Sequence, residues 1–435
     1  MNKQKVKYLS GKYVLFLIDY ELPFREATYI KIIMKTKNQK RGDYDMKKGL
    51  SLLVILMLVL SLAVTGCGKK QEATTPPPAA ADDVIKIGIF EPMTGANAAG
   101  GALEVEGIRL ANELYPEVLG KKVELVLADN KSDVVEAASA AARLVDRDKV
   151  VAIIGSWGSS LSMAAGDIVR DAKVPAVAAS ATNPLVTLGN DFYFRVCFLD
   201  PFQGTVMANY AYNNLGAKKV AIIREVSSDY SVGLAKFFED AFKQLTGDPN
   251  AVIEVSNYNT GDSDFSSQLL NISAKNPDAI FAPGNFTESA LIIAQARKLG
   301  IQTPFFGGDT WETPEFLELG GAAVEGAVFS TFFSSDVPIT EESQIFLDAY
   351  RAKFGKEPAA VTALGYDAYL VILKAIERAG TTDPEAIRNE IAKTANFPGA
   401  AGMITLDENG DAVKSAVIKV VKDGEFVYST TVEPF

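Results

Sequence analysis

The chain contains no histidine and only two cysteines and two tryptophans among its 435 residues. The absence of histidine excludes Ser-His-Asp and Cys-His catalysis and every histidine-ligated metal site. Cys67 and Cys197 are too few for a disulfide-rich scaffold, and they do not have metal-ligand spacing. Enzymes that use lysine, tyrosine or carboxylate pairs are not excluded, but no pairing of a base with a nucleophile is visible. We therefore expect a protein that is not an enzyme and that has no cofactor and no metal.

Positive charge is scarce after the N-terminal segment. Residues 1–66 carry 12 Lys+Arg against 5 Asp+Glu, so the total charge of −11 divides into +7 for this segment and −18 for the remainder. A body this acidic repels nucleic acid, and no basic stripe is present that could neutralise phosphates. We expect no nucleic-acid partner.

The longest apolar run lies between residues 49 and 66. Lys47 and Lys48 precede it and small residues come just before Cys67, which is the order of parts in a secretory signal peptide. Val64-Thr65-Gly66-Cys67 resembles the lipobox of bacterial lipoproteins, and the resemblance implies cleavage before Cys67 and lipidation of its sulfur. The alternative is a single transmembrane anchor, because the run is nearly long enough to span a bilayer.

The segments on either side of the apolar run fit an anchored, extracytoplasmic protein. Residues 67–83 are rich in proline and alanine and cannot bury a core, so they predict an extended tether behind a lipidated cysteine. Residues 1–45 are basic and precede a complete signal sequence at 46–66, so we expect translation to start at Met46 and residues 1–45 to be a misassigned extension. A basic DNA-binding head is the rival interpretation, but a membrane signal follows where a soluble hinge would be needed.

From residue 84 onward, strand-like and helix-like segments alternate. Residues 84–90 and 150–155 are almost continuously apolar, as is typical of strands covered on both faces, and 102–114 has helical periodicity. The same rhythm starts again near Pro201. Because this order predicts parallel sheets with helices on both sides, two rounds predict an α/β protein of two Rossmann-like lobes joined by a multi-strand hinge.

The end of the chain returns to the first lobe and then forms hairpins. Helices are expected at 342–354 and 362–379, and 402–432 contains Asn-Gly and Asp-Gly turn signals typical of β-hairpins. The predicted lobes are therefore 84–200 plus 331–407, and 201–330 plus 408–435. Since ligands of doubly wound sheets bind at the carboxyl ends of the strands, we expect a site in the cleft between the lobes.

The strand-to-helix junctions supply candidate ligand contacts. Ser159 and Ser160 open a predicted helix, whose N-terminal N–H groups and dipole attract a carboxylate; alternatively, either serine only caps the helix. Trp157 and Trp311 both follow strands, so we expect at least one of them to line the ligand. The glycine-rich segment 155–160 lacks the lysine of a P-loop and the spacing of GxGxxG, which argues against nucleotide binding.

Several of these junctions together resemble the leucine/isoleucine/valine-binding protein family of ABC importers. The resemblance covers residues 84–435 in order and implies the type I periplasmic binding protein fold. The matching segments are IGI and PMTG within 87–95, IGSWGSS at 154–160, PAVAASATNP at 175–184, DYSVG at 229–233, AQARKLG at 294–300 and GYDA at 365–368.

The resemblance also implies a role for each site residue. Ser159, Ser180 and Thr182 would hold an α-carboxylate, Asp309 would meet an α-ammonium, and Tyr230 would close from the second lobe. Hydroxyls for an anion and a carboxylate for a cation suit an α-amino acid, because charge-assisted hydrogen bonds are the strong ones. The set expected at the cleft is Gly100, Trp157, Ser159, Ser180, Ala181, Thr182, Tyr230, Asn285 and Asp309.

Two residues depart from the family pattern. Gly100 stands where the branched-chain binders carry a tyrosine, and Trp157 stands where they carry a smaller apolar residue, so the side-chain pocket has been rebuilt. Leucine, isoleucine or valine is thus the family default, while an aromatic amino acid or a small amide stays open. The family's two-cysteine loop is also absent, and we expect Cys197 to be a buried free thiol.

The function predicted from the sequence is that of a lipid-anchored, monomeric solute-binding subunit of an ABC importer. It would deliver an amino acid to a membrane permease by hinge closure. A ligand-sensing ectodomain is the alternative, and it requires a membrane span or signalling domain beyond the binding region. An enzyme is the least expected class, because the strand-end acids Glu91, Asp129 and Asp309 have no nucleophile beside them in the sequence.

Overall fold

The computed structural model describes residues 5–9, 13–17 and 84–434, which belong to two separate units, Met1–Ala79 and Ala80–Phe435. In the first unit, β1 (Lys5–Leu9) and β2 (Tyr13–Leu17) pair antiparallel. The signal peptide, lipidated cysteine and tether predicted within residues 46–83 lie outside the described residues. Among the helices that the structure describes, none is both long and apolar enough to cross a membrane.

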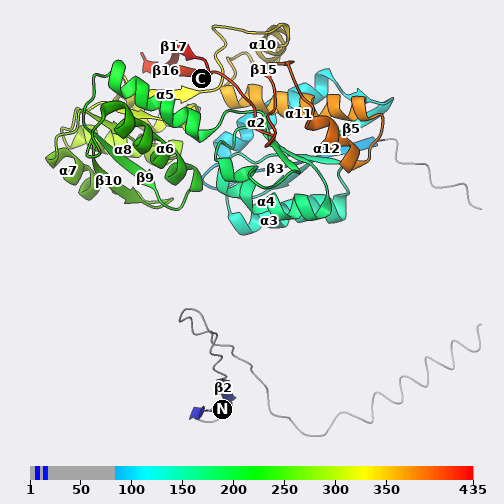
Figure 1. Cartoon of the computed structure of the whole chain (residues 1–435), viewed down its shortest axis with the longest axis horizontal. Helices are drawn as coiled ribbons and strands as arrows, with labels where there is room; N and C mark the ends of the chain where they lie inside the picture. Colours follow the sequence, from blue (N-terminus) through cyan, green and yellow to red (C-terminus); the bar gives the residue numbers. More distant parts are fainter. Residues whose placement is uncertain (1–4, 10–12, 18–83, 435) are drawn as a thin grey trace, which may run out of the picture. The chain divides into compact units, whose positions relative to one another are not determined.

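One half of the second unit is built on a six-stranded sheet of order β4-β5-β3-β6-β7-β8, in cyan and teal in Figure 1. All neighbouring strands run parallel except β4, which is antiparallel to β5. The strands are β3 (Val84–Glu91), β4 (Glu117–Val118), β5 (Lys121–Asp129), β6 (Ala152–Ile154), β7 (Ala176–Ala178) and β8 (Tyr193–Arg195). The helical segments between them are α2 (Ala98–Leu114), α3 (Val134–Arg143), η1 (Leu144–Asp148), α4 (Ser159–Ala172) and η2 (Pro184–Val186).

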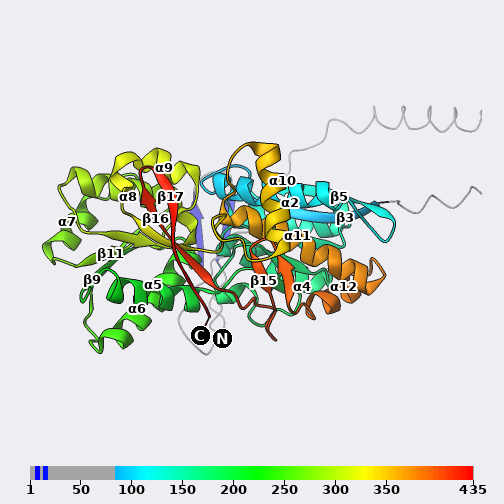
Figure 2. The ribbon, with the colours of Figure 1, turned by 90° about the horizontal axis from the view of Figure 1, so that it is seen from above.

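The other half is built on a seven-stranded sheet of order β10-β9-β11-β12-β13-β16-β17, in which the strands run parallel up to β13 and antiparallel after it. Figure 2 shows α5 and α6 on one side of this sheet and α8 and α9 on the other. Its strands are β9 (Val220–Glu225), β10 (Val252–Tyr258), β11 (Ala279–Phe281), β12 (Phe305–Gly307), β13 (Val328–Thr331), β16 (Ala416–Lys422) and β17 (Glu425–Val432). The helical segments are α5 (Asp200–Asn213), α6 (Asp229–Thr246), α7 (Ser266–Ala274), α8 (Phe286–Lys298), η3 (Asp309–Trp311), α9 (Pro314–Gly320) and η4 (Gly321–Val324).

After β13 the chain returns to the first half before it completes the second sheet. The returning elements are α10 (Glu341–Phe354), α11 (Ala360–Ala379), α12 (Pro384–Ile391), β14 (Phe397–Gly399) and β15 (Gly402–Ile404). The chain therefore passes between the two sheets three times, before β9, after β13 and before β16. These three connecting segments form the multi-strand hinge that the sequence predicts.

The faces of the first sheet follow from the alternation along β3. Ile85, Ile87 and Ile89 pack with α2 and α11, whereas Phe90 packs with α3 and α4 on the opposite face. Helices α2 and α11 approach each other closely because glycine faces the partner helix. A Cβ at Gly107 would lie 1.8 Å from the carbonyl oxygen of Thr362. This crossing fixes the start of α2 beside the carboxyl ends of the strands.

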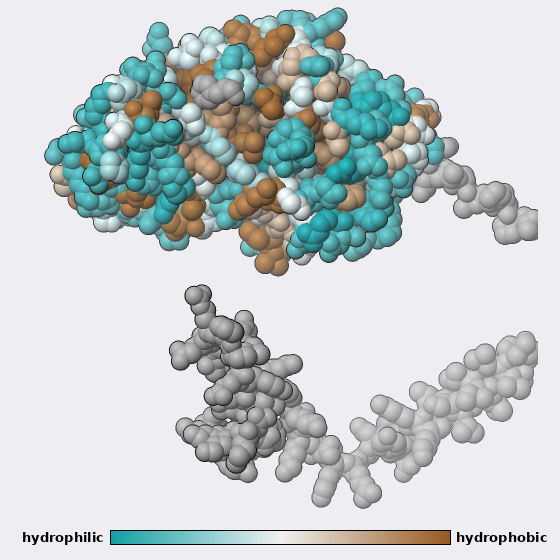
Figure 3. Space-filling view, viewed as in Figure 1, coloured by the Kyte–Doolittle hydropathy of each residue, from teal (hydrophilic) through white to brown (hydrophobic). Residues whose placement is uncertain are grey.

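The fold class and the β-α-β order agree with the sequence prediction, and the differences lie at the edges of the two sheets. Antiparallel strands close both sheets, so neither is purely parallel. The hairpin between β16 and β17 forms as predicted, with Asp423 and Gly424 at positive φ in its turn. The Asn409-Gly410 turn signal also reverses the chain, with the N–H of Asp407 donating to the carbonyl of Asp411 at 2.9 Å, but the pairing there is limited to a single bridge between Leu406 and Ala412, and β15 pairs with β14. Figure 3 shows hydrophilic residues over much of the outer ends of this face and hydrophobic residues gathered nearer its middle.

Candidate ligand-binding cleft

A cavity of about 90 Å³ lies at the carboxyl ends of the strands and is lined from both halves of the second unit. One water needs roughly 10–15 Å³ of such space, so the cavity has room for a small molecule. The lining residues from the first half are Ala96, Asn97, Ser132, Val134, Trp157, Gly158, Ser159, Ser160, Leu161 and Ser180. Those from the second half are Glu225, Ser227, Ser228, Tyr230, Thr260, Asn285, Asp309 and Thr310.

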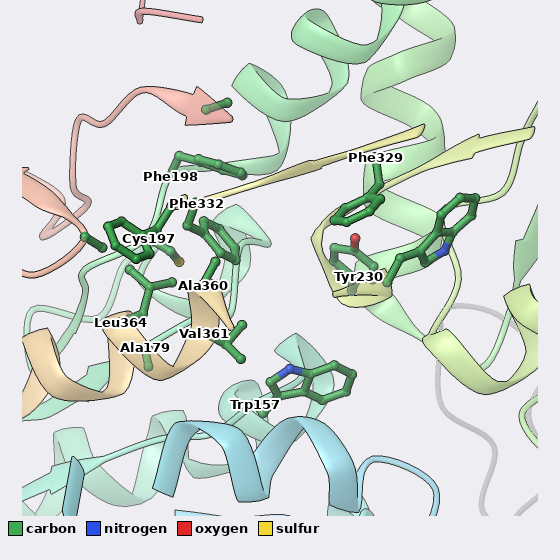
Figure 4. Close-up of a cluster of buried hydrophobic side chains, with 14 of the residues drawn as sticks. Trp157, Ala179, Cys197, Phe198, Tyr230, Phe329, Phe332, Ala360, Val361 and Leu364 are labelled. Carbon is green, nitrogen blue, oxygen red and sulfur yellow. The ribbon is translucent and has the colours of Figure 1, made fainter. Parts of the chain in front are cut away.

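The two halves touch each other around this cavity. The backbone N–H of Asp229 donates to Ser160 Oγ at 3.0 Å, and its carbonyl accepts from Asn183 Nδ2 at 2.9 Å. The Trp157 and Phe286 rings meet edge to face, with centroids 6.0 Å apart. Figure 4 shows Trp157 and Tyr230 approaching from opposite halves. The cleft is therefore in a closed arrangement, with its two walls in direct contact.

Helix α4 points its N-terminus into the cavity. Its N-cap is Gly158, at φ 95°, and no side chain caps the helix. Ser159 and Ser160 thus occupy the first helical turn and are not the N-cap, so their backbone N–H groups have no partner within the helix. Ser159 Oγ accepts from the N–H of Asn183 at 3.2 Å, which leaves its own proton for a ligand. These donors at the positive end of a helix are suited to an anion.

Ser180 follows β7 and contributes a hydroxyl to the same wall. It is 5% exposed and donates to the Oε1 atom of Glu104, a residue of α2 that is fully buried. Burial raises the pKa of Glu104 to about 7, while the hydrogen bond from Ser180 acts in the opposite direction. Glu104 was not among the residues expected at the cleft. The apolar spacing of its helix predicts only which face is buried. No signal in the sequence distinguishes Glu104 as a residue of the site.

Asp309 supplies negative charge from the opposite wall. It follows β12, is 3% exposed, and its Oδ1 accepts from Gln203 Nε2 at 2.7 Å and from the Tyr230 hydroxyl at 2.9 Å. Burial raises the pKa of Asp309 to about 6. A cationic ligand group beside it would favour the ionised form. Gln203, on α5, was also not predicted; its only signal is that it is one of two polar residues, with Asp200, on the buried face of the helix.

Gly100 and Trp157, the two residues predicted to depart from the family pattern, pack against each other. A Cβ at Gly100 would lie 2.3 Å from Cε2 of the Trp157 indole, so the indole occupies the space beside the glycine backbone. Trp157 lines the cavity, while Trp311 is buried against Phe316 with ring centroids 4.8 Å apart. Of the two tryptophans, one lines the cavity and the other belongs to the core.

The remaining predicted residues lie at or behind the wall. Asn285 lines the cavity, and its Nδ2 donates to Asn97 Oδ1 at 3.3 Å across the cleft. Thr182 and Ala181 are buried behind the lining residues. The Thr182 hydroxyl faces the Asp200 carboxyl, and burial raises the pKa of Asp200 to about 8. Cys197 is buried and free, as the sequence predicts.

The charges of the lining residues restrict the ligand. Among the residues that line the cavity, Glu225 and Asp309 are acids and none is a lysine or arginine. Burial raises the pKa of Glu225 to about 6. An acidic ligand side chain would have no cation to meet it here. A single carboxylate can be bound by the donors of α4, and a single ammonium by Asp309, which together suit a zwitterion with an uncharged side chain.

Comparisons with known proteins agree with this arrangement. Residues 84–425 match the sequence model of the periplasmic binding protein family. The Leu/Ile/Val-binding protein BraC3 of Rhizobium johnstonii is 33% identical over 335 residues, which cover 75% of this chain and 88% of that protein. The solved leucine binding protein LivK from Thermotoga maritima is 48% identical with a TM-score of 0.78, covering 80% of this chain and 99% of that one. LivJ from Streptococcus pneumoniae, solved with isoleucine, is 35% identical with a TM-score of 0.76, covering 81% and 100%.

Two mostly parallel sheets with a cavity between their strand ends define a type I periplasmic binding protein, a class that binds substrates and does not transform them. The chain belongs to the periplasmic binding protein family, and within it to the leucine/isoleucine/valine-binding proteins. The family, the fold class and the expectation of a protein that is not an enzyme are thereby confirmed.

Proposed function

We propose that this protein is the solute-binding lipoprotein of an ABC importer and that it binds a branched-chain amino acid in the cavity between its halves. The observation that carries the proposal is the opposition across the cavity of hydroxyl and N–H groups to an acid, with Ser159 and Ser180 on one wall and Asp309 on the other. An α-amino acid places its carboxylate against the first wall and its ammonium against the second. Tyr230 holds Asp309 in position.

The size and polarity of the cavity favour a small apolar side chain. Leucine, isoleucine and valine are small zwitterions with uncharged, apolar side chains. Trp157, Leu161 and Val134 provide apolar contact for the ligand's side chain. The names of the relatives point the same way, since one binds leucine and another was solved with isoleucine.

A thermal-shift and calorimetric screen tests this function. The purified protein is unfolded and refolded to remove carried-over ligand, then titrated with leucine, isoleucine, valine, phenylalanine, glutamate and small amides. We expect stabilisation by the branched-chain group, about 2.7 kcal/mol at 100 times Kd, and no response to glutamate. A response to an amide or an aromatic compound, with none to the branched-chain group, would refute the ligand class.

Hinge closure is the delivery step that we propose. The lobes 84–200 plus 331–407 and 201–330 plus 408–435 would separate to admit the ligand and close on it. The contacts that opening must break are the Asp229–Ser160 hydrogen bond, the Asp229–Asn183 hydrogen bond and the Trp157–Phe286 ring contact. Small-angle scattering with and without leucine should show a smaller radius of gyration in the bound state. An unchanged radius would contradict closure as the response to ligand.

The lipid anchor at Cys67 and the start at Met46 complete the proposal. They are supported by the order of charged, apolar and small residues before Cys67 and by the proline-rich segment after it. Mass analysis of the membrane-bound protein should find an acylated N-terminal cysteine, and Cys67→Ala should release the protein from the membrane fraction. A peptide from upstream of Met46 would contradict the proposed start. The permease partner would recognise the closed form from outside the membrane.

A further inference from the structure

Two buried glutamates lie directly behind the first wall of the cavity. Glu91 ends β3 and Glu104 lies in the second turn of α2, and both side chains are 0% exposed. Glu91 Oε2 accepts from the backbone N–H of Trp157 at 2.7 Å, and Glu104 Oε1 accepts from the Ser180 hydroxyl. Each glutamate therefore holds, from behind, one of the residues that line the cavity.

The two glutamates also face each other. Their other oxygens, Glu91 Oε1 and Glu104 Oε2, are buried and have no donor among the described residues. Burial, followed by the charge of Glu104, raises the pKa of Glu91 well above its usual range, and the two carboxyl groups lie within hydrogen-bond reach. Two ionised carboxylates at this separation repel each other. One shared proton would turn this acceptor–acceptor contact into a hydrogen bond, and the raised pKa of Glu91 favours that state.

A second proton on this pair would change what Ser180 offers to a ligand. The Ser180 hydroxyl has a single proton, and while Glu104 is ionised that proton is donated to Glu104. Ser180 then presents only lone pairs to the cavity, and these repel a ligand carboxylate. Once Glu104 is protonated, its own O–H can donate to Ser180, and the serine proton is free to turn to the ligand.

We propose that the cleft takes up a proton from solvent together with its ligand's carboxylate, and that Glu104 is the positioning residue that receives this proton. The inference rests on the proposed function, because it needs a ligand that places a carboxylate at Ser180. The step forms one O–H bond on Glu104 and redirects the Ser180 hydrogen bond. No other bond changes, and the ligand remains a zwitterion.

Other charged groups around Glu104 set the pH range of this effect. Glu91 faces it from β3, Asp309 from η3, Tyr193 from β8, and the Cys197 thiol lies nearby. On α11, which packs against α2, the acid Asp367 accepts instead from the N–H groups of residues 400 and 401, and the Tyr366 hydroxyl donates to Glu342. The Arg195 guanidinium is paired with Asp411.

Asp309 responds to pH in the opposite direction. A ligand ammonium favours its ionised form, so affinity falls when pH drops below the pKa of Asp309, about 6. Glu104 must be protonated in the complex, so affinity falls when pH rises above its pKa, about 7. Affinity should therefore be highest close to neutrality. Because the chain has no histidine, buried carboxyls with raised pKa values are the side chains best suited to take up a proton in this range.

Calorimetry in two buffers of different ionisation enthalpy, phosphate and Tris, counts the protons taken up. At about pH 7.5 we expect roughly three-quarters of a proton per bound L-leucine, and a Kd that rises by up to about tenfold per pH unit above this. Glu104→Gln mimics the protonated acid and should abolish both the uptake and the slope. Glu106→Gln is the matched control, since Glu106 lies on the same helix and accepts from the Tyr350 hydroxyl away from the cavity. It should keep the behaviour of the unmodified protein.

Each outcome separates this inference from the proposed function. Leucine binding with the same enthalpy in both buffers overturns the inference alone, and so does uptake that persists in Glu104→Gln. The buffer comparison uses the unmodified protein, so it decides the matter even if the variant fails to fold. No binding of leucine at all overturns the proposed function and this inference together. A merely structural role for Glu104 would weaken binding without changing the proton count.

Discussion

The two walls of the cavity treat charge in opposite ways. In the second half, Asp309 brings a carboxylate to the cavity surface, where Gln203 and Tyr230 hold it with two hydrogen bonds. In the first half, the wall consists of hydroxyls and N–H groups, and the acids Glu91 and Glu104 are set one layer back. The second wall therefore meets a ligand ammonium through the Asp309 carboxylate, with Glu225 as a further acid, whereas the first wall relies on several hydroxyl and N–H groups whose orientation is set from behind. The effects of substitutions should follow this difference.

The largest effect is expected at Asp309. Asp309→Asn leaves a bound ammonium without its charge partner, so leucine binding should weaken by at least about 2 kcal/mol, roughly thirtyfold in Kd. Calorimetric titration with leucine measures this loss of affinity. Asp240→Asn, an exposed acid on α6 paired with Lys236, is the control and should bind as the unmodified protein does. A loss under about 0.5 kcal/mol would remove Asp309 from the site.

The Gly100–Trp157 contact should show the next largest effect. Gly100→Ala places a methyl group against the indole, and overpacking of this kind costs about 2 kcal/mol of unfolding free energy and displaces Trp157. We expect about tenfold weaker leucine binding and a changed tryptophan fluorescence. Gly166→Ala in α4 is the matched control, because a Cβ there meets only Asn190 Nδ2 at an ordinary 3.5 Å. Equal losses of leucine affinity in Gly100→Ala and Gly166→Ala would show that the Gly100–Trp157 contact has no specific role in binding.

The first wall should be less sensitive to loss of one donor. Ser159→Ala removes a hydroxyl but leaves the N–H groups of α4, so leucine affinity should fall by only about 1 kcal/mol, roughly fivefold. A titration of Ser159→Ala beside Asp309→Asn compares the walls directly. If the serine variant loses as much affinity as the aspartate variant, the contrast between shared and single contacts is wrong.

The last prediction concerns the dependence of stability on pH and is independent of ligand binding. Burial raises the pKa values of Glu104, Asp200 and Asp309 to about 7, 8 and 6, whereas unfolded acids titrate near 4. The folded state therefore binds more protons than the unfolded state between about pH 4 and 8, so the unfolding free energy should decline as pH rises through this window. Urea unfolding of the ligand-free protein at pH 5 and 8 measures it, and Asp200→Asn should reduce the slope. Higher stability at pH 8 than at pH 5 would contradict these raised pKa values.

The strand and helix order was predictable because local patterns encode it. Continuous apolar runs such as β6, and helical periodicity such as that of α2, require no knowledge of partners. Junction residues were predictable for the same reason, since the ends of parallel strands converge on one edge. Ser159, Ser180, Tyr230 and Asp309 accordingly line one cavity. The pairing of β15 with β14 was not predictable, because the two strands are only three residues long and no Asn-Gly or Asp-Gly signal stands between them.

By itself, the sequence determined the class of the protein. The lack of histidine, the two rounds of β-α-β order and the polar junctions depend only on residue type and spacing, which act locally. Only the tertiary structure decided the meeting of Glu104 with Glu91 and Ser180, and the fit of Trp157 over Gly100. These contacts join residues that are distant in the chain, and they arise because the α2–α11 crossing brings the start of α2 against the strand ends. No local sequence pattern indicates such a contact, because the residue type of each partner is the same whether or not the contact forms.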